Sequence, residues 1–194
     1  MKLFSQKQKV EDKQPVLFLD RDGVINVDTG YVHLIEDFIF IDDIFKIVQL
    51  ANSLNYLVII VTNQAGIGRG IYSIETFKKT SNWMIKNFKR NNAHIDAVYF
   101  SPYHPINGKG RYLKKENTRK PGHGMFQEAL KDFNIDIKKS IMLGDKITDL
   151  EASTKFGISN NFLFNNSSEE IINSKNISFK RIASLIDLKP FLSK

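Results

Sequence analysis

Short apolar runs alternate with amphipathic stretches along most of this 194-residue chain. The runs are rich in β-branched and aromatic residues, and apolar runs of this kind are typical of strands buried on both faces of a sheet. The pattern predicts five such strands, at residues 16–20, 56–61, 96–100, 140–143 and 161–164. In the tail we expect a short helix after residue 167, a short strand near residues 177–179 and a last helix that ends at Leu192.

The amphipathic stretches between the strands have helical spacing. In residues 42–54, Ile44, Ile47 and Val48 fall on one face, and Ser73 is a suitable N-cap for the next helix. Further helices are predicted at residues 73–90, 125–133 and 148–156. Strands that alternate with helices indicate an α/β fold, a Rossmann-like and mostly parallel sheet flanked by helices. In such sheets ligands bind beyond the carboxyl ends of the strands.

The division of the chain follows from its polar segments. Residues 1–14 are polar and lysine-rich, which predicts a basic N-terminal extension. Residues 15–194 contain no internal repeat and no dividing linker, so we expect a single domain there. Residues 101–124 form a polar loop that is too long for a plain connector, and long loops in compact domains are often functional.

Composition narrows the classes of protein to consider. Hydrophobic residues make up 42% of the chain and charged residues 25%, which are ordinary values for a globular protein. Cysteine is absent, which rules out disulfides and thiolate metal sites. The polar start lacks the apolar segment of a secretory signal, and no apolar run is long enough to span a bilayer. We therefore expect a cytoplasmic protein that makes no membrane contact.

The formal net charge of +7 allows several kinds of partner. A basic balance suits nucleic acid, an anionic surface or phosphorylated small molecules, and it also arises from a general bias toward lysine. The lysines are scattered and are not interleaved with aromatic residues. We therefore regard nucleic acid as an unlikely partner.

Two aspartates follow the first predicted strand directly. Asp20 and Asp22 lie in the sequence Asp-Arg-Asp-Gly, at a strand end where their carboxylates project near each other. Adjacent carboxylates repel unless a cation is present, so a hard divalent ion is expected. Taken alone, the pair also fits a simple turn, because Asp and Gly are common turn residues.

A glycine-rich stretch follows the second predicted strand. Its sequence, TNQAGIGRG at residues 62–70, offers a hydroxyl, two amides, flexible backbone N–H groups and a cation. Such a loop can hold a phosphate, although a plain glycine-rich loop is the alternative. The candidate phosphate or substrate contacts are Thr62, Asn63, Gln64 and Arg69.

Two further charged groups complete the set. Arg119 and Lys120 precede a predicted helix, and they offer a bidentate cation and a compact point charge for phosphate. Asp145 and Asp149 follow the fourth predicted strand. Asp145 could complete a metal site, although Asp is also common at helix starts.

The four clusters are more informative together than apart. Each lies at the carboxyl end of a different predicted strand or in the loop after one, so a parallel sheet would bring them to one edge. The set contains a nucleophile, an acid/base, a metal ligand and phosphate-binding cations. This inventory matches phosphoryl transfer through a covalent aspartyl phosphate.

The order and types of these motifs resemble the haloacid dehalogenase superfamily over residues 16–164. The resemblance is strongest to the branch that holds D-glycero-D-manno-heptose-1,7-bisphosphate 7-phosphatase and histidinol-phosphate phosphatase, whose members lack a large cap domain. The segments that carry it are FLDRDGVIN (18–26), TNQAGIGRG (62–70), RKPGHGM (119–125) and MLGDKITDLEA (142–152).

The resemblance implies a hydrolase with defined residue roles. Asp20 would be the nucleophile and Asp22 the general acid and base. Magnesium would be held by the side chains of Asp20 and Asp145 and by the backbone carbonyl of Asp22. The phosphoryl oxygens would contact Thr62, Asn63 and Lys120; the distal part of the substrate would contact Arg119 and Arg69; Lys146 and Asp149 would support the site.

The chain departs from that branch in the loop after the third predicted strand. Many members carry a structural zinc there, bound by the pattern Cys-Pro-His-His-Pro and a later Cys-x-Cys-Arg-Lys-Pro. Here the corresponding segments read SPYHP at 101–105 and ENTRKP at 116–121. A single histidine, His104, cannot form a tetrahedral zinc site, so no structural zinc is expected.

The resemblance implies a small phosphorylated sugar as the substrate and a monomeric enzyme. The first reading is removal of the 7-phosphate of D-glycero-D-manno-heptose 1,7-bisphosphate. The alternatives are histidinol phosphate or another sugar phosphate and, in a different class, processing or binding of nucleic-acid ends. Arg119 beside Lys120 favours a doubly anionic sugar.

Overall fold

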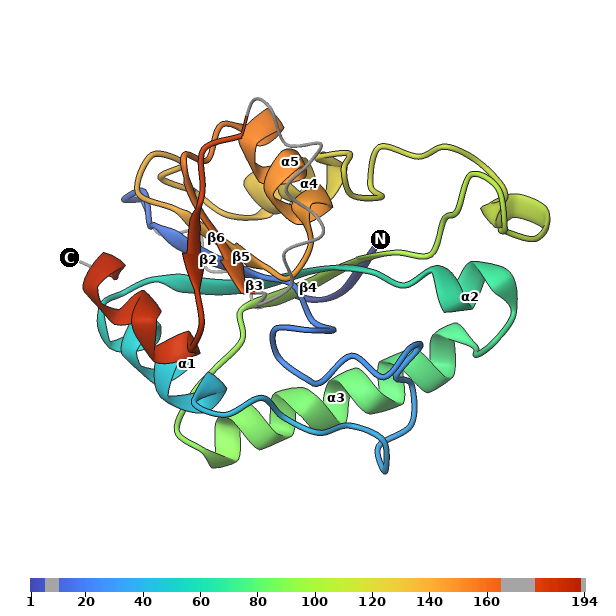
Figure 1. Ribbon diagram of the computed structural model, residues 1–194, viewed down its shortest axis with the longest axis horizontal. Helices are drawn as coiled ribbons and strands as arrows, with labels where there is room; N and C mark the ends of the chain where they lie inside the picture. Colours follow the sequence, from blue (N-terminus) through green and yellow to red (C-terminus); the bar gives the residue numbers. More distant parts are fainter. Residues whose placement is uncertain (6–10, 165–176, 193–194) are drawn as a thin grey trace.

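The computed structural model describes residues 1–5, 11–164 and 177–192, and these contain one seven-stranded sheet with the order β1-β4-β3-β2-β5-β6-β7 (Figure 1). Neighbouring strands are parallel except for β1, which runs antiparallel to β4. The strands are β1 (Lys2–Ser5), β2 (Val16–Leu19), β3 (Leu57–Asn63), β4 (Ala97–Ser101), β5 (Ile141–Gly144), β6 (Asn160–Phe164) and β7 (Lys180–Ile182). The expected α/β fold is confirmed.

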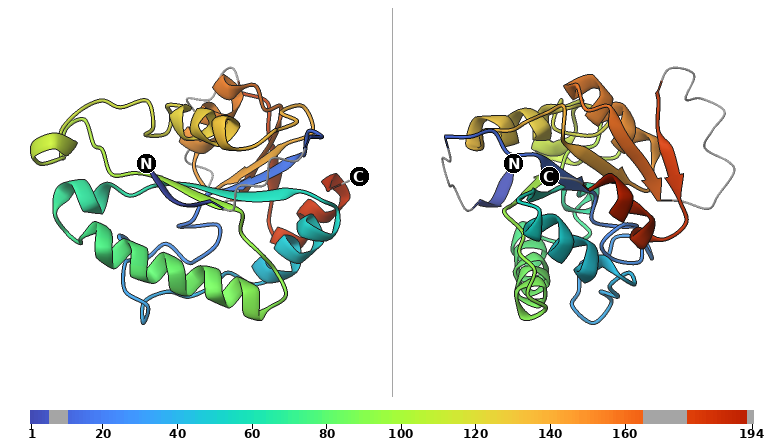
Figure 2. Two further views of the ribbon diagram at one scale, coloured as in Figure 1. Left: turned by 180° about the vertical axis from the view of Figure 1, so that it is seen from behind. Right: turned by 90° about the vertical axis from the view of Figure 1, so that its left-hand side faces the viewer.

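Helices cover both faces of the sheet (Figures 1 and 2). The α-helices are α1 (Ile44–Ser53), α2 (Ala65–Arg69), α3 (Ile74–Arg90), α4 (Gly124–Asp132) and α5 (Ile147–Phe156), and the 3-10 helices are η1 (Gly110–Tyr112) and η3 (Leu185–Phe191). Helices α1 and α3 lie on one face, with η3 packed against α1, while α4 and α5 lie on the other. Ser73 caps α3 as expected, because its hydroxyl accepts the backbone N–H of Thr76. None of the helices in the described residues is long and apolar enough to cross a bilayer.

Strand β2 illustrates how the apolar runs build two cores. All four of its residues are completely buried. Successive side chains of a strand point to opposite faces, so Leu17 and Leu19 join the core under α1 and α3. Val16 and Phe18 join the core under α4 and α5. A strand with apolar cover on both faces needs apolar residues at every position, which explains the absence of alternation.

Several elements differ from the sequence-based predictions. Lys2–Ser5, which we assigned to a basic extension, form β1 and pair with β4. The strand expected near residues 177–179 begins at Lys180, and the last helix is a 3-10 helix. The short helix expected after residue 167 lies outside the described residues. Ile177 and Phe179, where the described residues resume, pack against the core under α4 and α5.

The sheet order explains where ligands should bind. Strand β2 lies at the centre, with β3 on one side and β5 on the other. From β2 the chain proceeds to β3 and β4, and then returns to the far side of β2 to form β5. The loops after β2 and β5 therefore diverge, and crevices at such switch points are common ligand sites.

Candidate active site

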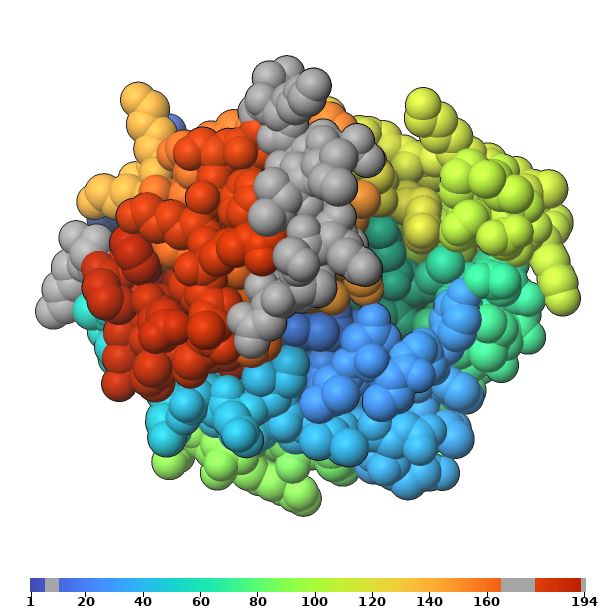
Figure 3. Space-filling model, in the orientation of Figure 1, coloured from blue at the N-terminus to red at the C-terminus, as the bar shows by residue number. Residues whose placement is uncertain are grey.

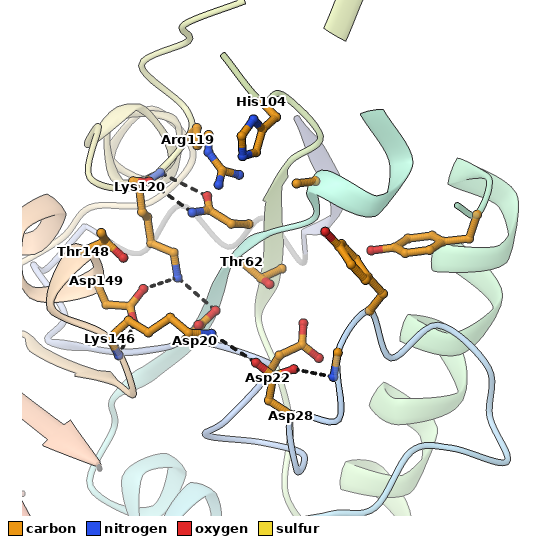
Figure 4. A pocket seen from close by; sticks show the side chains of 15 residues that line it. Asp20, Asp22, Asp28, Thr62, His104, Arg119, Lys120, Lys146, Thr148 and Asp149 are labelled. Carbon is orange, nitrogen blue, oxygen red and sulfur yellow. Dashed lines mark hydrogen bonds and ion pairs between the residues drawn. The ribbon is translucent and has the colours of Figure 1, made fainter. Parts of the chain in front are cut away.

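A cleft of about 450 Å³ opens at the carboxyl ends of β2, β3 and β5. Figure 3 shows the surface hollowed between the blue segment near residues 25–35 and the yellow-green segment near residues 105–115, and Figure 4 shows the side chains that line the hollow. The lining residues are Asp20, Asp22, Asp28, Gly30, Tyr31, Thr62, Asn63, Ala65, Tyr72, His104, Arg119, Lys120, Lys146, Thr148 and Asp149.

Asp20 lies at the floor of the cleft, where β2 ends. Its backbone N–H donates to the carbonyl of Leu143 at the end of β5, and its Oδ1 accepts the backbone N–H of Arg21 at 2.8 Å. The ammonium of Lys120 lies 2.9 Å from the same carboxylate (Figure 4). Burial raises the pKa of Asp20, and Lys120 opposes this shift. The carboxylate is thus fixed by the sheet and neutralised by one buried cation.

Lys120 links two carboxylates across the cleft floor. Its side chain is only 1% exposed, and Nζ lies 2.9 Å from Asp20, 2.6 Å from Asp149 and 2.7 Å from the carbonyl of Val61. Burial acts against the charge, but the two carboxylates outweigh it and raise the pKa of Lys120. The backbone of Lys120 is held in turn by Asn63, whose amide donates to its carbonyl at 3.1 Å and accepts its N–H at 3.0 Å.

Asp22 is surrounded by hydrogen-bond donors. Its Oδ1 accepts from Nε and Nη2 of Arg21 at 3.0 and 2.6 Å and from the amide of Asn26 at 3.0 Å. Its Oδ2 accepts from Nε2 of Gln64 at 3.0 Å. The buried hydroxyl of Tyr72 donates to Oε1 of Gln64 at 2.6 Å, and this bond fixes which end of the amide faces Asp22. The orientation of the Asp22 carboxylate is therefore set from several directions.

A buried acidic cluster lies next to Lys120. Ligand oxygens of Asp20, Asp145 and Asp149 fall within 4.8 Å of one another. Burial, followed by the charges of Asp20 and Asp149, raises the pKa of Asp145 to about 8. Gly23 makes room for this cluster, because a Cβ there would lie 2.3 Å from Oδ2 of Asp145. Its φ of 88° is also a backbone conformation that favours glycine. Three carboxylates this close favour a bound cation.

The other end of the cleft carries fixed cations and donors. Arg119 donates to the carbonyl of Tyr103 at 3.2 Å and points into the cleft beside His104 (Figure 4). Nδ1 of His104 accepts the backbone N–H groups of Ile106 and Asn107. The proton of the neutral ring is therefore on Nε2.

Arg69 and Lys146 contact residues of the loop after β2. Arg69 donates to the hydroxyl of Tyr31 and lies over its ring at 5.4 Å. Lys146 pairs with Asp28 at 3.1 Å and with Asp145 at 3.4 Å. Both cations tie neighbouring loops together at the rim of the cleft.

Aromatic and backbone contacts order the loop of residues 101–124. The rings of Tyr103 and Tyr112 lie 5.9 Å apart, and the ammonium of Lys114 lies 4.7 Å from the Tyr103 ring. The N–H of Lys109 donates to the carbonyl of Gly68 at 2.7 Å, which joins the loop to α2. These contacts hold the loop against α2 and pack its aromatic side chains against one another.

Most of the residues singled out from the sequence meet in this cleft. Asp145 and Gln64 lie behind its lining, and Arg69 contacts the lining residue Tyr31. The sequence analysis assigned nothing to Arg21 and Tyr72, which contact Asp22 and Gln64. The only sequence feature that could have indicated a role for Arg21 is its position between two aspartates. No sequence feature indicated a role for Tyr72.

The chain is similar to known phosphatases over most of its length. A family model described as polynucleotide kinase 3 phosphatase matches residues 16–179. D-glycero-alpha-D-manno-heptose-1,7-bisphosphate 7-phosphatase of Burkholderia mallei is 49% identical over 151 residues, which cover 78% of this chain and 80% of that protein. D-glycero-beta-D-manno-heptose-1,7-bisphosphate 7-phosphatase of Vibrio cholerae is 43% identical over 150 residues, which cover 77% and 81%.

A solved structure has the same fold. The D,D-heptose 1.7-bisphosphate phosphatase of B. bronchiseptica, complexed with magnesium and phosphate, superimposes with a TM-score of 0.80. The match covers 92% of this chain and 98% of that chain at 22% sequence identity. At this identity the likeness concerns the fold alone.

Proposed function

This chain belongs to the polynucleotide kinase 3 phosphatase family of haloacid dehalogenase-like phosphatases, and we propose that it removes the 7-phosphate of D-glycero-D-manno-heptose 1,7-bisphosphate. The observation that carries the proposal is the cleft floor, where Asp20, Lys120 and Asp149 form a buried charged row beside Asp22. The matched region spans about four fifths of each of the two relatives that are named for this sugar.

The proposed reaction has two steps. A carboxylate oxygen of Asp20 attacks phosphorus, the bond between phosphorus and the sugar oxygen breaks, and Asp22 gives a proton to that oxygen. Asp22 then takes a proton from water, the water oxygen attacks phosphorus, and the bond to Asp20 breaks to release phosphate. Lys120 and Thr62 are proposed to bind the phosphoryl oxygens, and Asn63 acts by holding the backbone of Lys120.

The acidic cluster fits magnesium. Mg²⁺ prefers oxygen ligands, and the carboxylates of Asp20, Asp145 and Asp149 offer three that lie close together and are largely buried. We propose that Asp20 and Asp145 hold the ion with the backbone carbonyl of Asp22. Asp149 is engaged by Lys120 at 2.6 Å and serves mainly to orient that ammonium. Bound Mg²⁺ would neutralise phosphate charge that otherwise repels the nucleophile.

The far end of the cleft supports a doubly anionic substrate. Arg119 and His104 present donors there, away from Asp20. We propose that Arg119 binds the phosphate that stays on the product. The relatives named above differ in the anomer they act on, so both anomers are candidates.

A panel of substrates tests the proposal. Phosphate release is measured with Mg²⁺ and with EDTA on both heptose bisphosphate anomers, histidinol phosphate, fructose 1,6-bisphosphate and a 3′-phosphorylated oligonucleotide. We expect Mg²⁺-dependent release with one heptose anomer preferred by ~10-fold or more in kcat/KM, which is about 1.4 kcal/mol in transition-state binding. The oligonucleotide is the rival substrate that the family name, polynucleotide kinase 3 phosphatase, suggests. A preference for it would overturn the sugar assignment.

Stability should depend on pH through the acidic cluster. The pKa of Asp145 is raised from 3.8 to about 8, so between these values the folded state binds a proton that the unfolded state does not. The free energy of unfolding in EDTA should therefore fall as pH rises from 5 to 8, by at most ~1.4 kcal/mol per pH unit.

Urea unfolding at several pH values measures this slope, with Asp145→Asn as the comparison. The variant should show a shallower slope, and Mg²⁺ should stabilise the wild-type protein but not the variant, because an ion bound only by the folded state adds stability. Equal slopes in both proteins would assign the pH dependence to other groups.

A further inference from the structure

Arg21 is among the largest completely buried side chains of the protein, at 1% exposure. The central carbon of its guanidinium lies over the rings of Phe38 and Phe77, 6.0 and 5.5 Å from their centroids. One of its nitrogens, Nη1, is buried and has no hydrogen-bond partner among the described residues. Burying a cation, and leaving one of its donors unsatisfied, costs stability. Stability alone therefore does not account for an arginine at this position.

The guanidinium is used as a fork on Asp22. Nε and Nη2 reach Oδ1 at 3.0 and 2.6 Å, and Nη2 also reaches Oδ2 at 2.8 Å. Contacts from one planar group to both oxygens fix the plane of a carboxylate as well as its position. Asp22 lines the cleft and its side chain is 18% exposed, so the fork controls which way an accessible carboxylate faces.

The same guanidinium holds the loop that walls the cleft. Nη2 of Arg21 donates to the backbone carbonyl of Val32 at 2.6 Å. Gly30 and Tyr31, which directly precede Val32, line the cleft. One buried group therefore contacts both the side chain proposed to transfer protons and the backbone beside the substrate-facing wall.

We propose that Arg21 is a positioning residue that aligns Asp22 for proton transfer and ties that alignment to the loop segment 30–32. The inference rests on the proposed function, because it concerns the second of the two aspartates in that mechanism. Arg21 is not among the residues that line the cleft, and its side chain is only 1% exposed. Its effect should therefore appear mainly in the chemical steps, with a smaller effect on substrate binding through the loop segment 30–32.

The variant Arg21→Met tests the proposal. Methionine has a similar length, and the nearby rings of Phe38 and Phe77 suit an apolar side chain. Asp22 keeps its hydrogen bonds from Asn26 and Gln64 and is partly exposed, so the fold should persist. For the sugar bisphosphate we expect kcat to fall ~100-fold with KM changed less than ~3-fold, which is the pattern of an interaction used only in the transition state. The matched control is Arg90→Met, an exposed arginine at the end of α3.

An aryl phosphate separates the two steps. Nitrophenolate leaves without a proton, so formation of the aspartyl phosphate does not need Asp22, whereas its hydrolysis does. With p-nitrophenyl phosphate, Arg21→Met should release a burst of about one nitrophenolate per folded molecule and then turn over slowly. A purely structural role would instead lower the burst amplitude and the steady rate together, in proportion to the folded fraction seen by circular dichroism.

The outcomes are distinguishable. If the wild-type enzyme is active, kcat of the variant can stay within 3-fold of it or fall only in proportion to the folded fraction. Either result overturns the role of Arg21 and leaves the proposed function standing. A wild-type protein that releases no phosphate from any substrate overturns the proposed function and this inference with it. If Arg21→Met does not fold, Arg21→Lys replaces it: a single ammonium cannot contact both oxygens and Val32 as the fork does, so wild-type activity in that variant would also overturn the proposal.

Discussion

Asp20→Asn is expected to abolish phosphate release, with kcat lowered by ~10⁴-fold or more. The amide oxygen is a poor nucleophile, so the variant lacks the group that is proposed to attack phosphorus. Asparagine has the same shape, and its amide can still accept the backbone N–H of Arg21. The loss should therefore be chemical and not structural, and the measurement is phosphate release under saturating Mg²⁺ and substrate.

The melting temperature of Asp20→Asn separates the two causes. Burial raises the pKa of Asp20, and without its charge Lys120 still pairs with Asp149 at 2.6 Å, so removal of the charge should cost little. We expect the metal-free variant to melt within ~4 °C of the wild-type protein, about the effect of 1 kcal/mol. Asp42→Asn, at an exposed aspartate just before α1, is the control and should leave activity unchanged. Residual activity above a few per cent in Asp20→Asn would contradict the covalent mechanism.

The strands of the central sheet were predictable because burial on both faces leaves a direct trace in the sequence. Strand β2 has four apolar residues in a row, all of them buried. The strands on either side of it, β3 and β5, show the same trace. Once the strands were assigned and taken to be parallel, the gathering of the motifs at one edge followed from topology.

Elements that depend on distant or weak signals could not be predicted. Strand β1 has only Leu3 and Phe4 as apolar residues, and it is stabilised by pairing with β4, far along the chain. Helix α2 forms within a glycine-rich segment of low helix propensity, and it ends at Gly70 in the left-handed conformation. In both cases tertiary contacts decide the local structure.

In the candidate site, the sequence indicated which residue types gather but not how they are divided between substrate and scaffold. Asn63, a predicted phosphate contact, has both ends of its amide engaged by the backbone of Lys120. Gln64 is turned toward Asp22 by Tyr72. Arg21, which sequence reasoning passed over, is buried and is not among the residues that line the cleft. Such assignments depend on side-chain directions that only the packed structure defines.

Lys120→Met is expected to impair both activity and stability. The ammonium is buried between two carboxylates, at 2.9 Å from Asp20 and 2.6 Å from Asp149, so its removal leaves two buried negative charges without their cation. Breaking a buried ion pair by removing one partner typically costs about 3–5 kcal/mol. We expect a loss of this size in urea unfolding with EDTA present, and a fall in kcat of ~10³-fold or more, because the transferring phosphoryl group loses a fixed positive charge.

The double variant Lys120→Met/Asp149→Asn separates the two effects. It removes the cation together with one of the carboxylates that it neutralises, so the remaining charge imbalance is smaller than in the single variant. Stability should recover by at least about half of the loss, whereas activity should stay as low as in Lys120→Met, since no charge has been returned to the phosphoryl site. Non-additivity of this kind is the signature of residues in direct contact. A double variant that is no more stable than Lys120→Met would show that the pair with Asp149 does not account for the cost. Recovered activity would mean that Lys120 acts only through the fold, and the proposed contact between its ammonium and the phosphoryl oxygens would then have to be abandoned.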